Sequence, residues 1–256
     1  MRFGYCTGPG ESGVLKATGY DYFEWGVSDA LMPLADDAAF EVALAKIKAA
    51  ALPCEALNGM VPGTLKITGP DADMAKLEAY VKTMCVRAKR VGIQRIVFGS
   101  GGARNVPEGF CRDKARAQIL DFLKMLGPHA QAAGLLIAIE PLNKKECNII
   151  NTVAEGAEIT RAVNHPAIRL LADAFHVLRD DEPIANVAKN LDIIVHTHIA
   201  TRANRMPPGV EACAGIQEFL QCLRDGGYKH RVTVEACGYT PAWALTALAT
   251  MRMWAS

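Results

Sequence analysis

The sequence predicts an α/β fold, a single (β/α)8 TIM barrel domain that spans residues 1–256, and three observations lead to it. The chain has 256 residues, the usual length of one such barrel. Eight strand-like runs alternate with helix-like runs from end to end. Most of the strand-like runs are apolar throughout, as for parallel strands buried on both faces. A flavodoxin-like or Rossmann sheet is the alternative, but it uses fewer strands, and no GxGxxG follows a strand here.

The predicted strands are short and rich in β-branched or aromatic residues. They comprise residues 2–6, 22–27, 54–60, 95–100, 135–142, 168–175, 193–199 and 231–236. Amphipathic helical segments follow them, over residues 37–51, 71–91, 112–133, 153–163, 182–190, 215–226 and 241–254. The first interval, residues 7–20, is weak as a helix because it contains Gly8, Pro9, Gly10, Gly13 and Gly19.

Composition excludes several classes of function. The formal net charge is +1, from 28 basic and 27 acidic residues, so nothing favours binding to nucleic acid or to an anionic membrane. We expect a cytoplasmic protein, because no signal sequence and no membrane-spanning apolar run is recognisable. The eight cysteines form no CxxC pair and are expected to be reduced. The apolar fraction of 50% is compatible with a homo-oligomer.

Ionisable residues recur where the later predicted strands end. Glu140 closes the run LIAIE, and Pro141 breaks the strand directly after it. By itself, Glu140 is as well explained by an ion pair with Lys144 or Lys145. Three further strands end in the same way, with Asp173 and His176, with His196 and His198, and with Glu235. Chemistry in this fold sits at the carboxyl ends of the strands, so these coincidences favour a site.

A divalent metal would remove the repulsion between the carboxylates at this mouth. Glu140, Asp173, Glu235 and one histidine offer three oxygens and one nitrogen. This set suits Mn²⁺, our preferred ion, or Mg²⁺ or Co²⁺, with Zn²⁺ less favoured. His196 and His198 face the same way, and His198 is chosen as the ligand because it is nearer the strand end. His196 is expected to be a hydrogen-bonded residue one layer deeper.

Four stretches resemble one family. IEPLNKKECNIINT, DAFH, HTHIATRANR and VEA are similar, in order and approximate spacing, to motifs of the xylose isomerase-like TIM barrels. Within these, the resemblance is to the sugar isomerases and epimerases of the D-tagatose and D-psicose 3-epimerase branch. It is strongest over residues 138–235. The segment between His198 and Arg205 is one residue longer than in that branch and lacks the Gly-Glu that usually follows the histidine.

The resemblance implies a function and roles. Glu140, Asp173, His198 and Glu235 would be the metal ligands, and Glu140 and Glu235 would also be the catalytic acid/base pair. Substrate oxygens would be bound by Glu146, His176 and Arg205. The implied reaction is C3 epimerisation of a ketose or related keto-polyol through a metal-stabilised enediolate.

Other functions remain open. The same residues fit an aldose–ketose or hydroxypyruvate-type isomerase, or a keto-polyol dehydratase, which differ in how the substrate lies. An endonuclease IV-type zinc hydrolase would need more histidine ligands and a basic DNA face. A non-catalytic metal- or sugar-binding barrel would not need the glutamate pair.

Two smaller expectations concern the substrate. Arg202, Arg205 and the Gly-rich turn at residues 99–102 could hold a phosphate. The favoured interpretation is that Arg205 binds hydroxyl groups and that Arg202 is solvated. Tyr5 and Phe98 are expected to line the pocket.

Overall fold

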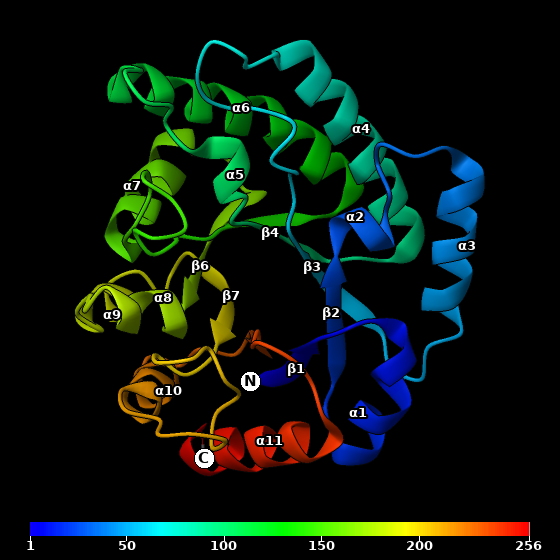
Figure 1. Ribbon diagram of the computed structural model, residues 1–256, viewed down its shortest axis with the longest axis vertical. Coiled ribbons are helices and arrows are strands. Elements are labelled where there is room, and N and C mark those ends of the chain that lie inside the picture. The colour runs from blue at the N-terminus through cyan, green and yellow to red at the C-terminus, as the bar shows by residue number, and fades with distance from the viewer. Residues whose placement is uncertain (256) are drawn as a thin grey trace.

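The barrel is closed, and its strands follow one another in chain order. The computed structural model describes residues 1–255, and within them eight parallel strands pair from β1 round to β8, which pairs with β1. They are β1 (Arg2–Cys6), β2 (Tyr22–Gly26), β3 (Cys54–Asn58), β4 (Arg95–Phe98), β5 (Leu136–Ile139), β6 (Ile168–Asp173), β7 (Ile194–Ile199) and β8 (Arg231–Val234). Figure 1 shows the helices around them. The predicted (β/α)8 barrel is confirmed.

Helices separate the strands. They are η1 (Pro9–Glu11), α1 (Ser12–Thr18), α2 (Val27–Ala30), α3 (Asp37–Lys48), α4 (Met74–Val91), α5 (Gly101–Arg104), α6 (Arg112–Ala133), α7 (Val153–Val163), α8 (Ala174–Arg179), α9 (Ala185–Ala188), α10 (Ile216–Asp225) and α11 (Pro241–Ala255). The weak interval at residues 7–20 thus forms η1 and α1, and Gly19 ends α1 with a φ of 103°. None of the helices within residues 1–255 is both long enough and apolar enough to cross a membrane.

Side-chain caps fix where several helices begin. Asp36 accepts a hydrogen bond from the backbone N of Ala39 at the start of α3, and Asp73 does the same at the start of α4. Thr152 caps α7 through the backbone N of Glu155. These caps satisfy backbone donors that the first helical turn leaves unpaired. The cap at Asp73 explains why α4 begins at Met74, three residues after the predicted start.

Strand residues alternate between two apolar regions. The larger core lies between the helices and the strands and includes Ile96, Ile137 and Leu170. A smaller cluster contains the alternating residues Val97, Ala138 and Leu171 together with Val195. Because successive strand side chains point to opposite faces, this smaller cluster marks the inside of the barrel. Two residues further along these strands, on the same inner face, the chain reaches Gly99, Glu140 and Asp173.

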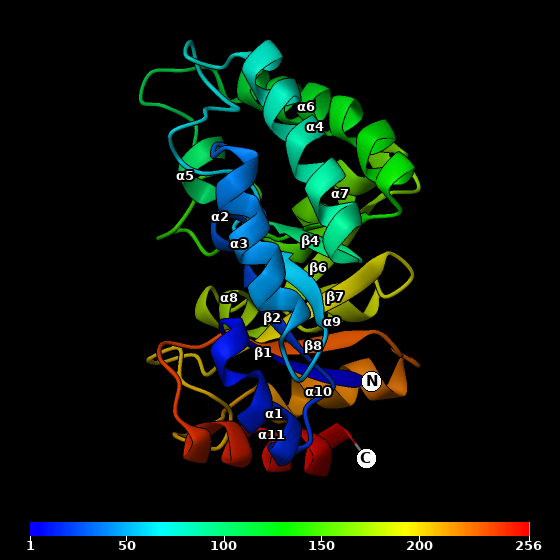
Figure 2. The same cartoon turned by 90° about the vertical axis from the view of Figure 1, so that its right-hand side faces the viewer.

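The short helices mark the end of the barrel where the strands terminate. Helices α2, α5 and α8 each follow directly on a strand or one short turn after it. Figure 2 shows them on one side of the barrel, with the N-terminus on the other. We call their side the mouth. The inward-facing strand ends therefore open onto the mouth, as expected for functional residues in this fold.

Glu55 provides a stability prediction at the opposite end of the barrel. Its carboxylate accepts from Arg231 Nε at 2.7 Å, and both side chains are buried. Glu55→Gln leaves the Arg231 charge without its carboxylate, so we expect the free energy of unfolding to fall by about 3 kcal/mol in urea titrations. Glu41→Gln, which breaks the exposed pair with Arg90, should cost less than about 1 kcal/mol. Equal losses in the two variants would contradict this expectation.

Candidate metal centre and active site

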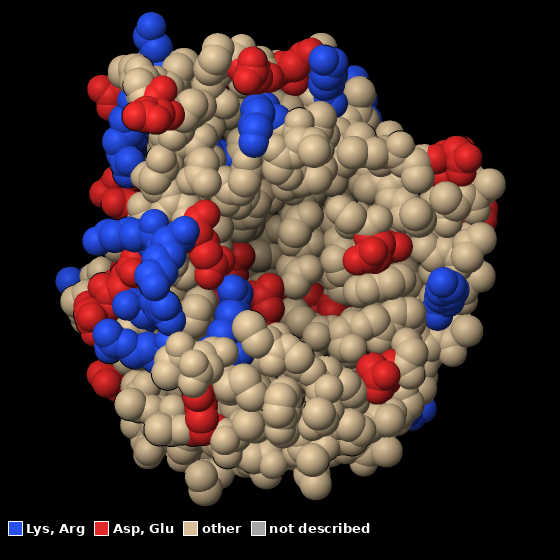
Figure 3. All heavy atoms as spheres, in the orientation of Figure 1, with Lys and Arg blue, Asp and Glu red and all other residues tan. Residues whose placement is uncertain are grey.

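Four of the predicted site residues meet at the mouth. Glu140 lies one residue beyond β5, Asp173 ends β6, His198 lies in β7, and Glu235 lies one residue beyond β8. One ligand atom from each lies within 4.8 Å of the others. Figure 3 shows the mouth as a hollow with acidic side-chain atoms inside it. Four successive strands, β5 to β8, thus bring three carboxylates and one imidazole to one point.

His198 is the centre of this group. Its Nδ1 lies 3.0 Å from Glu140 Oε1 and 3.3 Å from Glu235 Oε2. Its Nε2 lies 2.9 Å from Glu24 Oε1, and the ring is completely buried. In the neutral ring, an Nε2–H that donates to Glu24 would leave the Nδ1 lone pair on the side of the two other carboxylates, where an ion could bind it. A carboxylate behind a histidine in this way fixes the tautomer that can bind a metal.

Glu24, on β2, was not predicted from the sequence. Its second oxygen, Oε2, lies 2.8 Å from His196 Nε2, so one carboxylate connects both histidines of the HTH sequence. Thr233 Oγ1 also approaches His196 Nε2, at 3.2 Å. His196 therefore lies one layer deeper than His198 and is hydrogen-bonded there, as predicted. Glu24 joins the two layers.

The buried charges shift one another's pKa values. Burial alone would lower the pKa of His198, but Glu24, Glu235 and Glu140 raise it well above its usual range. Burial alone would raise the pKa of Glu24, but His198 and His196 hold it well below its ordinary value. Despite burial, His198 and Arg205 hold the pKa of Glu235 at about 2. The pKa of Asp173 is raised, chiefly by burial and also by Glu140. The carboxylates at the mouth therefore repel one another, and His198 and Arg205 do not fully offset this repulsion.

The donor set fits a divalent cation. Asp173 Oδ2 is buried and has no hydrogen-bond partner among residues 1–255. Such an atom is costly to bury unless an ion or ligand compensates it. Three carboxylates and one imidazole nitrogen suit a hard or borderline ion. Cys6, Glu24 and His198 form a second close group, but both Glu24 oxygens already bind histidines, so the first group is the better candidate.

Residues of helix α5 and strand β3 hold the two glutamates in place. Arg104 is completely buried, and its Nη2 donates to the backbone oxygen of Glu140 at 2.8 Å. Asn58, the last residue of β3, donates from Nδ2 to Glu235 Oε1 at 3.0 Å. Neither residue was predicted to belong to the site. The first contact fixes the backbone of Glu140, and the second orients the carboxylate of Glu235. The alternative ion pair of Glu140 with Lys144 or Lys145 is not found within residues 1–255.

The three predicted substrate-binding residues adjoin the cluster. Arg205 Nη1 lies 3.3 Å from Glu146 Oε1, and its Nη2 binds Glu235. His176 Nδ1 accepts from the backbone N of Asn143 at 3.2 Å, which leaves the ring proton on Nε2. That Nε2 lies 3.4 Å from Asp173 Oδ2 and has no hydrogen-bond partner among the described residues. All seven predicted residues thus lie together, with unused polar atoms facing the cluster.

Gly99 has no side chain and so leaves room for the Glu140 carboxylate, which can be tested by substitution. A Cβ on Gly99 would lie 2.3 Å from Glu140 Oε2. Gly99→Ala should therefore displace that carboxylate and weaken Mn²⁺ binding by at least about tenfold, measured by calorimetry on the chelator-treated protein. Gly13→Ala is the control, because a Cβ there meets nothing within 4 Å. An unchanged affinity in Gly99→Ala would show that Glu140 is not held at the predicted position.

Other predicted or conspicuous features lie elsewhere. Tyr5 and Phe98 were expected to line the pocket, but both are fully buried in the outer core, because their strand positions face the helices.

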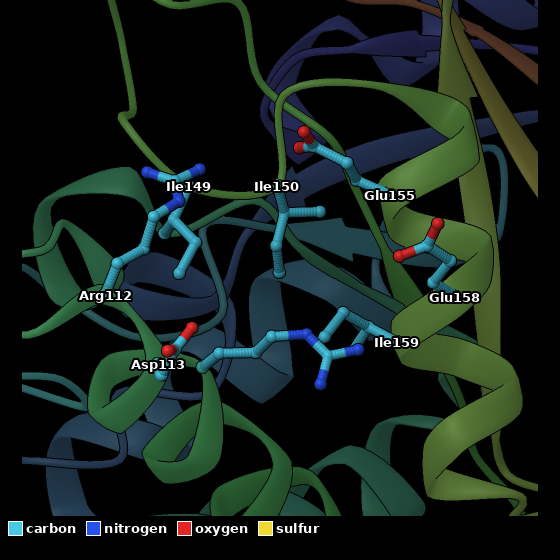
Figure 4. A pocket seen from close by; sticks show the side chains of 8 residues that line it. Arg112, Asp113, Ile149, Ile150, Glu155, Glu158 and Ile159 are labelled. Carbon is cyan, nitrogen blue, oxygen red and sulfur yellow. The ribbon is translucent and has the colours of Figure 1, made fainter.

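A cavity of about 190 Å³ lies between the start of α6 and α7, and Figure 4 shows its arginine and glutamate side chains. Arg112, Arg116, Glu155 and Glu158 are among the residues that line it. This cavity contains none of the residues of the cluster, so it is not the candidate active site.

Known proteins with similar sequences are sugar epimerases by name. The chain is 29% identical over 107 residues to a D-psicose 3-epimerase of Ruminiclostridium cellulolyticum, which covers 41% of this chain and 36% of that protein. It is 29% identical over 129 residues to a probable ketose 3-epimerase of Synechocystis sp., which covers 50% of this chain and 44% of that protein. The matched stretches therefore span less than half the length of either relative.

Structural similarity extends over the whole chain. A D-psicose 3-epimerase from Clostridium cellulolyticum H10, crystallised with D-tagatose, superposes with a TM-score of 0.84 and 18% sequence identity. The superposition covers 100% of this chain and 99% of that one. At this identity the likeness establishes the fold. The family model described as xylose isomerase-like TIM barrel matches residues 13–255, and the chain therefore belongs to the xylose isomerase-like TIM barrel family.

Proposed function

We propose that this chain is a divalent-metal-dependent sugar epimerase that inverts C3 of a ketose. The observation that carries the proposal is the pair of carboxylates, Glu140 and Glu235, at 3.0 and 3.3 Å from the same His198 nitrogen. Epimerisation needs one group that removes a proton from carbon and another that returns one to the opposite face. The names of the similar proteins support the same reaction class.

The metal would be held by Glu140, Asp173, His198 and Glu235, and we propose Mn²⁺ as the preferred ion. When bound, it would supply positive charge to the ketose oxygens as negative charge develops on them.

The chain's own residues account for the proton transfers. Glu235 is ionised at neutral pH, because its pKa is about 2, and it can accept a proton. Glu140, protonated by exchange with solvent, would give its proton to the opposite face of the carbon, and Glu235 would then release to solvent the proton that it removed. His176 presents its Nε2–H beside Asp173 and can donate to a sugar oxygen, while Arg205 and Glu146 orient the hydroxyl groups. Asp173, His176 and His198 are buried, which strengthens their interactions, while the Glu235 side chain keeps 20% of its surface exposed and can exchange protons with solvent.

Metal-dependent exchange of deuterium tests the proposal. The protein is stripped with a chelator, reloaded with Mn²⁺, Mg²⁺ or Co²⁺, and incubated with a panel of ketoses in deuterated water. We expect chelation to abolish turnover, Mn²⁺ to restore it, and deuterium to enter C3 of an epimeric product. Label at C1 or C2 with an aldose product would instead show an isomerase. Absence of exchange on every ketose would refute the proposed reaction.

A further inference from the structure

Positive charge gathers on one side of the mouth. Figure 3 shows Lys and Arg side chains on the side where Figure 1 places α8, while the opposite rim is mostly uncharged. Two of these cations already have carboxylate partners. Arg202 lies 2.6 Å from Asp181, and Arg205 binds Glu146 and Glu235. The charge available to a ligand must therefore come from other residues.

Arg179, at the end of α8, is one such residue. Its Nη1 donates to the backbone oxygens of Arg202 and Ala203 at 3.3 and 3.2 Å, at the upper end of the usual hydrogen-bond range. Its Nε and Nη2 have no acceptor in the part of the chain that the structure describes, and no carboxylate there lies within 4.0 Å of the guanidinium. One edge of the guanidinium fork is therefore free to bind a ligand.

Lys145 is the second available cation. Its backbone N donates to Asn143 Oδ1, but among residues 1–255 its ammonium group has neither a hydrogen-bond acceptor nor an ion-pair partner. The side chain is exposed at the rim. Lys145 comes from the loop after β5 and Arg179 from α8, so two separate elements each contribute an unpaired positive charge.

One cavity joins these two cations to the proposed sugar site. Its volume is about 390 Å³, and Lys145, Arg179, Glu146 and Arg205 all line it. The guanidinium carbons of Arg205 and Arg179 lie 4.6 and 5.7 Å from the ring centroid of Phe175, which also lines the cavity. The cavity therefore extends from Arg205, which binds Glu235 of the candidate metal site, to Arg179 at the rim.

The Gly-rich turn does not provide the alternative phosphate site that the sequence allowed. Gly99 lies against the Glu140 carboxylate, and Gly101 lies against the backbone oxygen of Glu146. The Glu140 carboxylate is negatively charged and the Glu146 backbone oxygen is a hydrogen-bond acceptor, so both disfavour a bound anion. Arg202, the other candidate, is neutralised by Asp181.

We propose that Arg179 and Lys145 form a subsite for a terminal oxyanion, so that the ketose substrate carries a phosphate ester or a carboxylate at the end remote from the reacting carbon. This inference rests on the proposed function, because the cavity is continuous with the proposed sugar site. A free guanidinium edge binds either oxyanion through two parallel hydrogen bonds, and the lysine adds a point charge. Glu146 lines the same cavity, but Arg205 and Asn143 already bind its carboxylate.

Matched substrates test the inference through their kcat/KM values. A neutral ketose, its terminal phosphate ester and its terminal carboxylate are compared in the exchange assay with metal-loaded protein. We expect one or both anionic substrates to be better by about ten- to a hundredfold, chiefly through KM. The preferred anion identifies the chemistry of the ligand. Arg179→Met should remove most of this preference, Arg179→Lys should retain part of it, and Arg202→Met is the control that should leave it intact.

A binding measurement separates this inference from the proposed function. Inorganic phosphate is titrated into metal-loaded wild type and Arg179→Met by calorimetry at constant ionic strength, after melting curves establish that the variant is folded. Weaker phosphate binding in Arg179→Met supports the subsite even if no ketose exchanges deuterium, in which case only the reaction is wrong. Equal phosphate affinity in the two proteins, or a neutral ketose that equals the anionic ones, overturns the inference.

Discussion

Replacing Glu235 with glutamine should lower the rate of deuterium exchange at C3 by about a hundred- to ten-thousand-fold, the contribution expected of a positioned general base. The amide cannot accept the proton, and it also removes one carboxylate from the metal cluster. Glutamine is nearly the same size, so the hydrogen bond with Asn58 and the strand end should persist. The expected loss is therefore chemical and not a loss of fold.

Three measurements define this result. Exchange is followed by proton NMR, Mn²⁺ affinity by calorimetry, and folding by the melting temperature. Glu218→Gln is the matched control, because this glutamate is exposed on α10 and is not part of the group of ligand residues at the mouth. If Glu235→Gln retains wild-type exchange at saturating Mn²⁺, Glu235 is not the base. If exchange is lost only below saturation, Glu235 acts as a ligand alone.

The fold was predictable because its signals are repeated and local. Each buried parallel strand must be apolar on both faces, and each helix must carry one apolar stripe. Strand ends were less predictable. The fifth strand was predicted to end at residue 142, whereas β5 ends at Ile139. Composition shows where the chain is apolar, but the register with β4 and β6 decides where pairing stops.

The predicted site residues could be recognised in the sequence for a different reason. Glu140, Asp173, His198 and Glu235 are charged or polar residues at the ends of apolar runs, and the fold brings such ends together. Their grouping is confirmed by the structure, while their roles stay predictions. Arg179 was not singled out, because an arginine at the end of a helix is ordinary in sequence. Only the geometry shows that its guanidinium has no carboxylate partner among residues 1–255.

Glu24 is a site residue that was not predicted from the sequence. The same rule that selected Glu140 applies to it, since it is a carboxylate inside the apolar run YFEWG. It was passed over because it lies within the strand and not at its end. Its partners come from β7, more than 170 residues later in the chain, and that pairing depends on closure of the barrel. Asn58 was missed because the predicted strand continued to residue 60, whereas β3 ends at Asn58.

Glu24→Gln should raise the dissociation constant for Mn²⁺ by about ten- to a hundredfold, the usual cost of removing a partner that orients a metal-binding histidine. Both Glu24 oxygens accept hydrogen bonds from imidazole Nε2 atoms. An amide offers one acceptor and one donor in their place. A donor facing His198 Nε2 would move the ring proton to Nδ1, and the lone pair would no longer face Glu140 and Glu235.

This expectation can be separated from a general loss of stability. Free Mn²⁺ is measured by electron paramagnetic resonance during titration, and imidazole ¹⁵N shifts report the tautomer of His198 in protein loaded with diamagnetic Mg²⁺. Glu55→Gln is the control, since it also removes a buried carboxylate, on β3 at the other end of the barrel. That variant should unfold more easily yet bind Mn²⁺ as wild type does. If Glu24→Gln keeps wild-type affinity with the tautomer unchanged, Glu24 supports the barrel and does not set the orientation of His198.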